Sequence, residues 1–224
     1  MVPLSRALGL ASPLIVENGG ALLVPEGHLP RPPRGAELRA GFWTIVLGAR
    51  RPDLLRALEE VARDLRIGVR SFASLDPAEV TALTGLSSPA ARLAQQREYD
   101  EPFLLEDETA AAALAEAVRG RGLRVTRGGR FWHLTGEADK GRALRVLLDL
   151  HEADGRRFAT VALGDSANDV SLLRAVERPI LVPRPRGAVD PELAAALPGA
   201  EHAPAPGPAG WNAAVLAVLE GRRL

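Results

Sequence analysis

The sequence predicts an α/β protein in which a parallel sheet is interrupted by an inserted α+β domain. Residues 158–163 and 179–182 are continuous apolar runs separated by a helical stretch, as in a parallel sheet buried on both faces. Residues 41–134 carry their own mixed pattern of strands and helices. Polar residues cluster at 164–169, directly after the first apolar run, where open α/β sheets bind their ligands.

The N-terminal part predicts the tail of a helix at residues 4–10 and then a strand reversal. Apolar runs at 13–16 and 21–24 are separated by residues 17–20, whose Asn and Gly tolerate positive φ. Residues 25–35, rich in proline, are expected to form a loop.

The middle part predicts a strand at 42–47 and a helix at 52–65, from the helical spacing of its leucines. Two more helices are expected to begin at Asp76 and at Ser88, each as an N-cap followed by proline. The remaining elements expected here are a strand at 103–105, a helix at 107–119 closed by Gly120, and a hairpin of 123–126 and 131–134 across 127–130.

The C-terminal part predicts a helix at 139–151, the central strand at 158–163 and a helix over 170–176. A strand at 179–182, a loop rich in proline and glycine, and a last helix at about 210–219 complete the pattern. The chain contains no internal repeat.

Composition excludes several classes of function. The 28 basic residues balance 28 acidic ones, so no general attraction to nucleic acid or to an anionic membrane is expected. Cysteine is absent, which excludes disulfides, thiolate metal sites and a cysteine nucleophile. No apolar run is long enough for a membrane span, and a signal peptide is not expected, so we predict a cytoplasmic protein.

The turn at 164–169 predicts a site for a hard cation and a phosphate. Asp165 and Asp169 can supply one direct and one water-mediated ligand to Mg²⁺, which keeps several waters. Ser166 and Asn168 can hydrogen-bond phosphate oxygens or fix the carboxylates. The alternative is helix capping, because Asp, Ser and Asn favour helix N-termini. A single cap needs one such residue, so four within six positions favour a site.

Lys140 is the only lysine of the chain and lies in the first turn of its predicted helix. A cation there opposes the helix dipole, unless an anion is held by the ammonium and the helix N-terminus together. The alternative is an exposed lysine paired with Asp139 or Glu137.

Other polar segments give weaker signals. The turn at 17–20 is explained by its turn chemistry, and a purely structural role and a role in a site are equally open. Arg130 and His133 could reach a substrate anion, although a surface arginine and a partly packed histidine are commoner. Residues 97–103, with three carboxylates near an aromatic side chain, are expected mainly as a solvated loop.

These segments resemble the haloacid dehalogenase (HAD) superfamily of phosphatases. Residues 164–169 resemble its fourth motif, and Lys140 resembles its third. More narrowly, the chain resembles the mannosyl-3-phosphoglycerate phosphatases in segments that follow one another in the same order: residues 15–21, 97–103, 128–133, 139–143 and 206–212.

The resemblance implies a Rossmann-like core of residues 1–38 and 137–224, with a C2-type α+β cap at 39–136. It implies Mg²⁺-dependent hydrolysis of mannosyl-3-phosphoglycerate, by way of an aspartyl-phosphate, to mannosylglycerate and phosphate. Asp165 would be the metal ligand, Asp169 its supporting acid, and Lys140 would hold the phosphate. Arg130 and His133 of the cap would contact the glycerate or the sugar. No nucleic-acid or membrane partner is implied, and the oligomeric state is not predicted.

One departure from the family pattern concerns the nucleophile. The family carries its nucleophile and general acid in an Asp-x-Asp motif on the first core strand. This sequence has no aspartate before Asp53 and no Asp-x-Asp anywhere. In the family, a Ser or Thr hydroxyl at the end of the second core strand, the second motif, binds phosphate. We therefore expect the first strand, the nucleophile and this hydroxyl to be missing. Either the true start lies upstream, which the intact later motifs favour, or a short product has lost catalysis. Another sugar-phosphate phosphatase and a catalytically dead sugar-phosphate-binding protein are the alternative functions.

Overall fold

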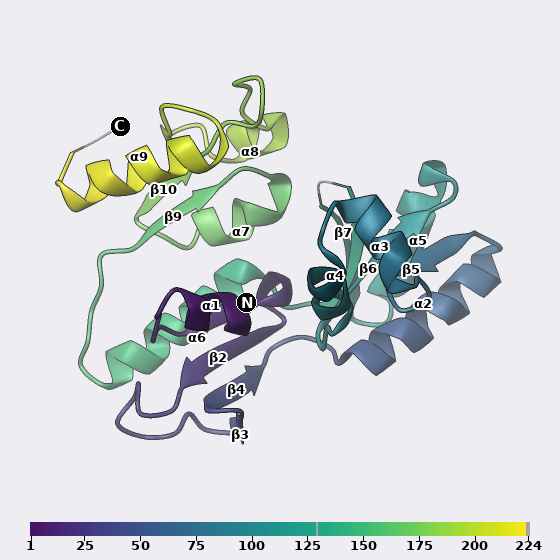
Figure 1. Cartoon of the computed structure of the whole chain (residues 1–224), viewed down its shortest axis with the longest axis horizontal. Helices are drawn as coiled ribbons and strands as arrows, with labels where there is room; N and C mark the ends of the chain where they lie inside the picture. The colour runs from purple at the N-terminus through teal and green to yellow at the C-terminus, as the bar shows by residue number, and fades with distance from the viewer. Residues whose placement is uncertain (129, 223–224) are drawn as a thin grey trace. The chain divides into compact units, whose positions relative to one another are not determined.

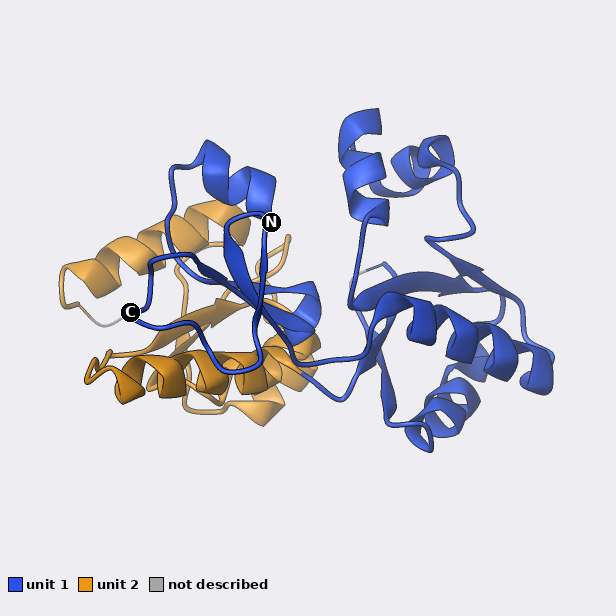
Figure 2. Ribbon diagram, turned by 90° about the horizontal axis from the view of Figure 1, so that it is seen from below, with its two compact units in different colours: residues 1–138 blue, residues 139–224 orange. Residues whose placement is uncertain are grey.

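A computed structural model describes residues 1–128 and 130–222 (Figure 1). Residue 129, in the predicted hairpin turn, lies outside the described residues. The chain divides into two compact units, residues 1–138 and residues 139–224 (Figure 2). The division lies close to residue 137, where the core was predicted to resume. The assignment of residues 1–38 to that core stays a prediction.

Unit 1 begins with a short helix and an antiparallel sheet with the strand order β1-β2-β4-β3. Val16 pairs with Ala21, so the predicted strand reversal is confirmed. The elements of this part are α1 (Val2–Ala7), β1 (Leu14–Val16), η1 (Glu17–Gly19), β2 (Ala21–Pro25), β3 (Glu37–Arg39) and β4 (Phe42–Val46).

A second antiparallel sheet in unit 1 has the strand order β5-β6-β8-β7. Helices α2 and α5 pack on it around Leu54, Phe103 and Leu114, which are fully buried. The helical spacing of leucines therefore predicted a real packing face. The elements are α2 (Arg51–Leu65), β5 (Val69–Ser71), β6 (Asp100–Leu105), η2 (Glu108–Ala110), α5 (Ala111–Arg119), β7 (Leu123–Arg127) and β8 (Trp132–Gly136).

Two short helices, α3 (Pro77–Thr84) and α4 (Ser88–Gln95), pack around Phe72 and Val80. Asp76 caps α3 as predicted, because its carboxylate accepts a hydrogen bond of 2.8 Å from the Glu79 amide. The predicted cap of α4 was wrong by one residue. The helix begins at Ser88, and the N-cap is Ser87, since the Ala91 amide donates to the Ser87 carbonyl.

Unit 2 contains the predicted parallel sheet, with the strand order β11-β10-β9. Its strands are buried on both faces: Leu181 packs toward α7 and α8, whereas Ile180 packs toward α9. The elements are α6 (Lys140–Ala153), β9 (Val161–Gly164), η3 (Ala167–Asp169), α7 (Val170–Leu173), β10 (Arg178–Leu181), α8 (Pro191–Ala196), β11 (Glu201–His202) and α9 (Gly207–Leu219).

Several predicted boundaries of unit 2 were wrong. The central strand begins at Val161, and Phe158 stays 45% exposed. Helix α7 ends at Leu173 instead of continuing to residue 176. The loop after residue 182 contains α8, which was not predicted and is capped by Asp190. Helix α9 begins at Gly207, three residues before the predicted start. Over the described part of the chain, no helix has both the length and the apolarity that a membrane span requires.

Candidate active site

The carboxylate of Asp169 is the centre of the polar turn that follows β9. Its side chain is buried, and Oδ1 lies 2.6 Å from Nζ of Lys140. Its Oδ2 accepts a hydrogen bond of 3.2 Å from the Asp165 amide, and Oγ of Ser166 lies 3.2 Å away. Asp169 therefore fixes both the backbone of the turn and the lysine that meets it from α6.

Asp165 differs from Asp169 because its side chain is exposed. Within residues 1–128 and 130–222, its carboxylate makes no hydrogen bond or ion pair, whereas its carbonyl accepts a hydrogen bond of 3.0 Å from Nε of Arg184. Together with Asp169 it borders an open pocket of about 420 Å³. The pocket is also lined by Gly207, Pro208 and Trp211. The Asp165 carboxylate, whose two oxygens have no hydrogen-bond partner among the described residues, thus lies at a pocket.

The capping alternative is wrong for the two residues of this turn that occupy N-cap positions. Ser166 is the N-cap of η3 and Asp169 is the N-cap of α7, and neither side chain makes a capping hydrogen bond. Oγ of Ser166 instead lies 2.5 Å from Oδ1 of Asn168. The polar side chains of the turn bond to one another or remain open, which leaves Asp165 available for a ligand.

Lys140 is the first residue of α6, as predicted, and Asp139 caps the helix by accepting from the Arg142 amide at 2.8 Å. The predicted alternative, pairing of Lys140 with a neighbouring carboxylate, was wrong: the ion pair is with Asp169. An ammonium has three donors, so the lysine keeps two for an anion. The negative charge of Asp169 also offsets the unfavourable placement of a cation at a helix N-terminus.

Gly141 allows this ion pair to form. A Cβ at this position would lie 2.1 Å from the backbone carbonyl oxygen of Ser171, so α6 can approach α7 only because residue 141 has no side chain. The Gly141 amide lies 3.4 Å from Oγ of Ser171. The close approach places Lys140 beside Asp169, and no pattern along the chain indicated it.

Arg130 and His133 belong to unit 1, and their assignment to a substrate stays a prediction. Arg130 is exposed. His133 is partly buried, and its Nδ1 lies 3.0 Å from both carboxylate oxygens of Asp100. The histidine is therefore held by a buried acid that the sequence had assigned to a solvated loop.

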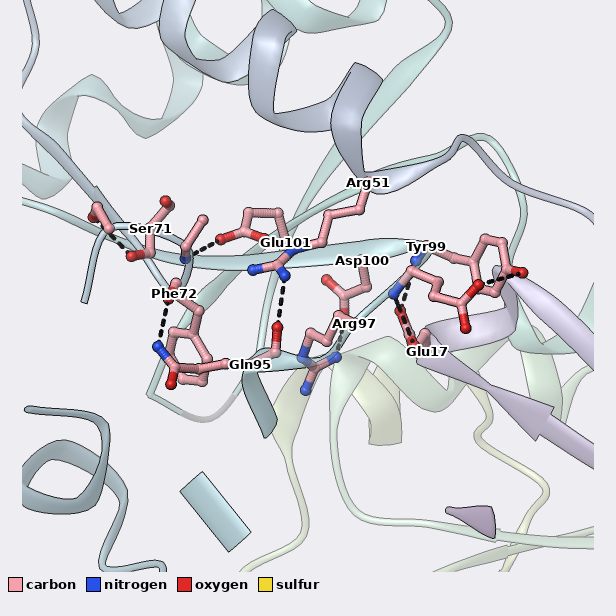
Figure 3. Close-up of polar contacts among 12 residues, drawn as sticks. Glu17, Arg51, Ser71, Phe72, Gln95, Arg97, Tyr99, Asp100 and Glu101 are labelled. Carbon is pink, nitrogen blue, oxygen red and sulfur yellow. Dashed lines mark hydrogen bonds and ion pairs between the residues drawn. The ribbon is translucent and has the colours of Figure 1, made fainter. Parts of the chain in front are cut away.

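Part of residues 97–103, which were predicted as a solvated loop, lies in a buried polar network, whereas Glu98 stays exposed (Figure 3). Asp100 and Glu101 are fully buried at the start of β6. The Glu17 carboxylate accepts hydrogen bonds from the amides of Tyr99, at 2.7 Å, and of Glu98. Burial raises the pKa of the Glu17 carboxyl above its ordinary value of 4.5, although these two amides oppose the shift.

One feature of the structure and one of the sequence mark this network. Glu17 and Asn18 adopt positive φ angles of 49° and 57°, a conformation that few residues other than glycine adopt. The apolar run that follows Glu101 identifies 100–105 as one buried strand rather than a loop followed by a short strand.

Comparison with known proteins identifies the family. No protein-family model matches the chain. The glucosyl-3-phosphoglycerate/mannosyl-3-phosphoglycerate phosphatase of Methanococcoides burtonii is 38% identical over 208 residues, which cover 92% of this chain and 76% of that protein. The enzyme of the same name from Persephonella marina is 35% identical over 222 residues, covering 96% and 79%.

The fold agrees with a solved sugar phosphatase of HAD subclass IIB, which superposes with a TM-score of 0.61 at 13% identity, covering 98% of this chain and 79% of the other. The α/β fold, with its parallel sheet in unit 2, is that of the HAD phosphatases. The chain therefore belongs to the glucosyl-3-phosphoglycerate/mannosyl-3-phosphoglycerate phosphatases, which are phosphoric monoester hydrolases, and it has the fold of the HAD phosphatases.

Proposed function

We propose that the turn at residues 164–169 and Lys140 form the metal- and phosphate-binding end of a Mg²⁺-dependent phosphatase acting on mannosyl-3-phosphoglycerate. The observation that carries this proposal is the contrast between the two aspartates. Asp169 is buried and paired with Lys140, whereas Asp165 presents an unpaired carboxylate at a pocket. The names of the two relatives support the substrate class and include the glucosyl compound as a second candidate.

The residues present fit Mg²⁺ as an open site. Among the described residues, no group of three or more His, Cys, Asp or Glu could hold a metal ion. Mg²⁺ does not require such a group, because it keeps several waters and is bound through one or two carboxylates plus substrate phosphate. Asp165 would hold the ion, and Asp169 would support it. The bound ion would polarise a phosphoryl oxygen.

The chain's own residues account for the phosphate end of such a substrate. The two unused donors of the Lys140 ammonium would bind phosphate oxygens, and the amide of Asn168 could add a neutral donor. Ser166 would hold Asn168 in place. These groups neutralise charge on the phosphate and orient it, and none of them is a nucleophile in the arrangement observed.

We further propose that the 224-residue polypeptide binds this substrate without hydrolysing it. Its sequence contains no Asp-x-Asp pair, so the aspartate that the family uses as nucleophile is not among these residues. Action in the cytoplasm belongs to the same proposal.

Calorimetric titration of the 224-residue polypeptide with mannosyl-3-phosphoglycerate tests the proposal. Binding should require Mg²⁺ and should weaken about tenfold to a hundredfold in Lys140→Met, because a hydrogen bond to a charged group is lost. Arg142→Met removes an exposed positive charge two residues away and should bind normally. Absence of Mg²⁺-dependent binding would overturn the proposal.

Assays of phosphate release complete the test. We expect no turnover by the polypeptide alone. Turnover that Asp165→Ala abolishes would support a phosphatase at this turn and would show that a nucleophile is present after all. Turnover that persists in Asp165→Ala would place the chemistry elsewhere.

A further inference from the structure

The Asp100 carboxylate joins three segments of unit 1. It lies at the start of β6, is fully buried, and pairs with Arg97 at 2.7 Å (Figure 3). Asn18, from the turn between β1 and β2, donates a hydrogen bond of 3.1 Å. His133, from β8, places Nδ1 at 3.0 Å from both oxygens. A buried carboxylate with donors from three segments has little freedom to move.

This arrangement determines which nitrogen of His133 carries the proton. A carboxylate paired with arginine only accepts hydrogen bonds, so Nδ1 of His133 must be the donor to it. In a neutral imidazole the other nitrogen, Nε2, then carries a lone pair and is an acceptor. Over the described part of the chain, Nε2 makes no hydrogen bond, and the side chain stays 15% exposed.

Gly128 leaves room for this imidazole. A Cβ at position 128 would lie 2.8 Å from Nε2 and 3.0 Å from Cδ2 of His133, too close for either atom. The Gly128 amide is meanwhile fixed by a hydrogen bond of 2.9 Å to the Phe131 carbonyl. The position of the imidazole thus depends on a missing side chain on one side and a buried carboxylate on the other.

We propose that Asp100 is a positioning residue that holds His133 with Nδ1 protonated, so that Nε2 accepts a hydrogen bond from a hydroxyl group of a sugar or glycerate ligand. The proposal rests on the proposed function for the identity of that ligand. A hydroxyl is favoured over a carboxylate because only the hydroxyl can donate to the lone pair of Nε2. Arg97 already balances the charge of Asp100, so this cluster does not depend on a ligand anion.

The first test reads the tautomer without any ligand. The chain has four histidines, so a long-range ¹H–¹⁵N spectrum of histidine-labelled protein is simple, and His133→Gln assigns the signal. In the neutral imidazole of His133 we expect a protonated Nδ1 and an unprotonated Nε2. Asp100→Asn should give a mixture of tautomers. A protonated Nε2 in the unchanged protein would overturn the proposal.

The second test adds ligands that separate this proposal from the proposed function. Mannosylglycerate and free mannose should shift the Nε2 signal, whereas inorganic phosphate should not. Sugars that leave Nε2 unchanged would overturn the inference, whatever phosphate does. Loss of Mg²⁺-dependent phosphate binding, with the sugar effect intact, would overturn the proposed function alone.

Two variants show that the effect is specific to this imidazole. Gly128→Ala should displace the ring and weaken mannosylglycerate binding about tenfold, as expected for one lost hydrogen bond, with phosphate binding unchanged. Gly128→Ala keeps the proposal testable if Asp100→Asn does not fold. His202→Phe, at an exposed position of unit 2, should leave the binding of both ligands unchanged. Equal effects of both substitutions would contradict the proposal.

Discussion

The ion pair between Arg51 and Glu101 gives the most direct test of the energetics of unit 1. Glu101 has no exposed side-chain surface and Arg51 has 15% (Figure 3). The Arg51 guanidinium also donates to the Gln95 carbonyl at 2.6 Å, and Glu101 accepts from the Ala73 amide at 2.9 Å. The pair therefore connects the start of α2, the end of α4 and β6.

In Arg51→Met, Glu101 keeps a single donor, and the Gln95 carbonyl loses one. Removing one partner of a buried pair costs about 3–5 kcal/mol, because it leaves a buried charge without compensation. The total stability of a domain is only about 5–15 kcal/mol. We therefore expect the substitution to lower the free energy of unfolding of unit 1 by a large fraction.

Arg70→Met is the matched control. Arg70 pairs with Glu79 at 2.6 Å, with side chains 48% and 42% exposed. A surface pair of this kind contributes about 0–1 kcal/mol. Urea unfolding compares the two variants, followed by the fluorescence of Trp132, on β8 of the same sheet, with Trp43 and Trp211 replaced by phenylalanine in both. The slope of the unfolding free energy against urea concentration should be the same in both variants. If Arg51→Met and Arg70→Met lower the free energy of unfolding by amounts equal within about 1 kcal/mol, the role given to burial is refuted.

Further predictions concern Glu17 and Gly141. Because the pKa of Glu17 is raised in the folded state, Glu17 contributes to stability below its ordinary pKa of 4.5, and this contribution is lost as the pH rises through the folded pKa. Glu17→Gln should therefore flatten this part of the stability–pH curve. An unchanged curve would contradict the assignment. Gly141→Ala should destabilise unit 2 by about 1–3 kcal/mol through its clash with Ser171, whereas Gly199→Ala, with no neighbour within 4 Å, should be nearly neutral in the same thermal unfolding measurement. Equal effects would show that α6 and α7 can separate.

The sequence predicted the elements whose signal is local. The strands of unit 2 were recognisable because Ile180 and Leu181 are both buried, on opposite faces of the sheet, which gives a continuous apolar run. The Asp76 cap was recognisable because its partner Glu79 lies three residues away. The missed helix α8 is short and lies in a segment whose prolines and glycines favoured a loop.

The contacts that complete the candidate site join residues distant in sequence. The polar turn and Lys140 were each singled out, but their ion pair spans 29 residues. The spacing of residues along the chain carries no information on such a contact. The network around Asp100 was missed for the same reason, since Asn18 lies 82 residues away. The charge of residues 97–103 favoured a solvated loop, whereas pairing with distant partners allows the burial of Asp100 and Glu101.

The central claim, that residues 164–169 bind the metal ion through Asp165, can be tested with Mn²⁺, which takes the same hard oxygen ligands as Mg²⁺. Paramagnetic broadening of backbone amide signals in the 224-residue polypeptide locates the bound ion. We predict strong broadening at residues 164–169 that Mg²⁺ reverses by competition and that Asp165→Asn abolishes. Broadening that is confined to other residues, or that persists unchanged in Asp165→Asn, would contradict the claim.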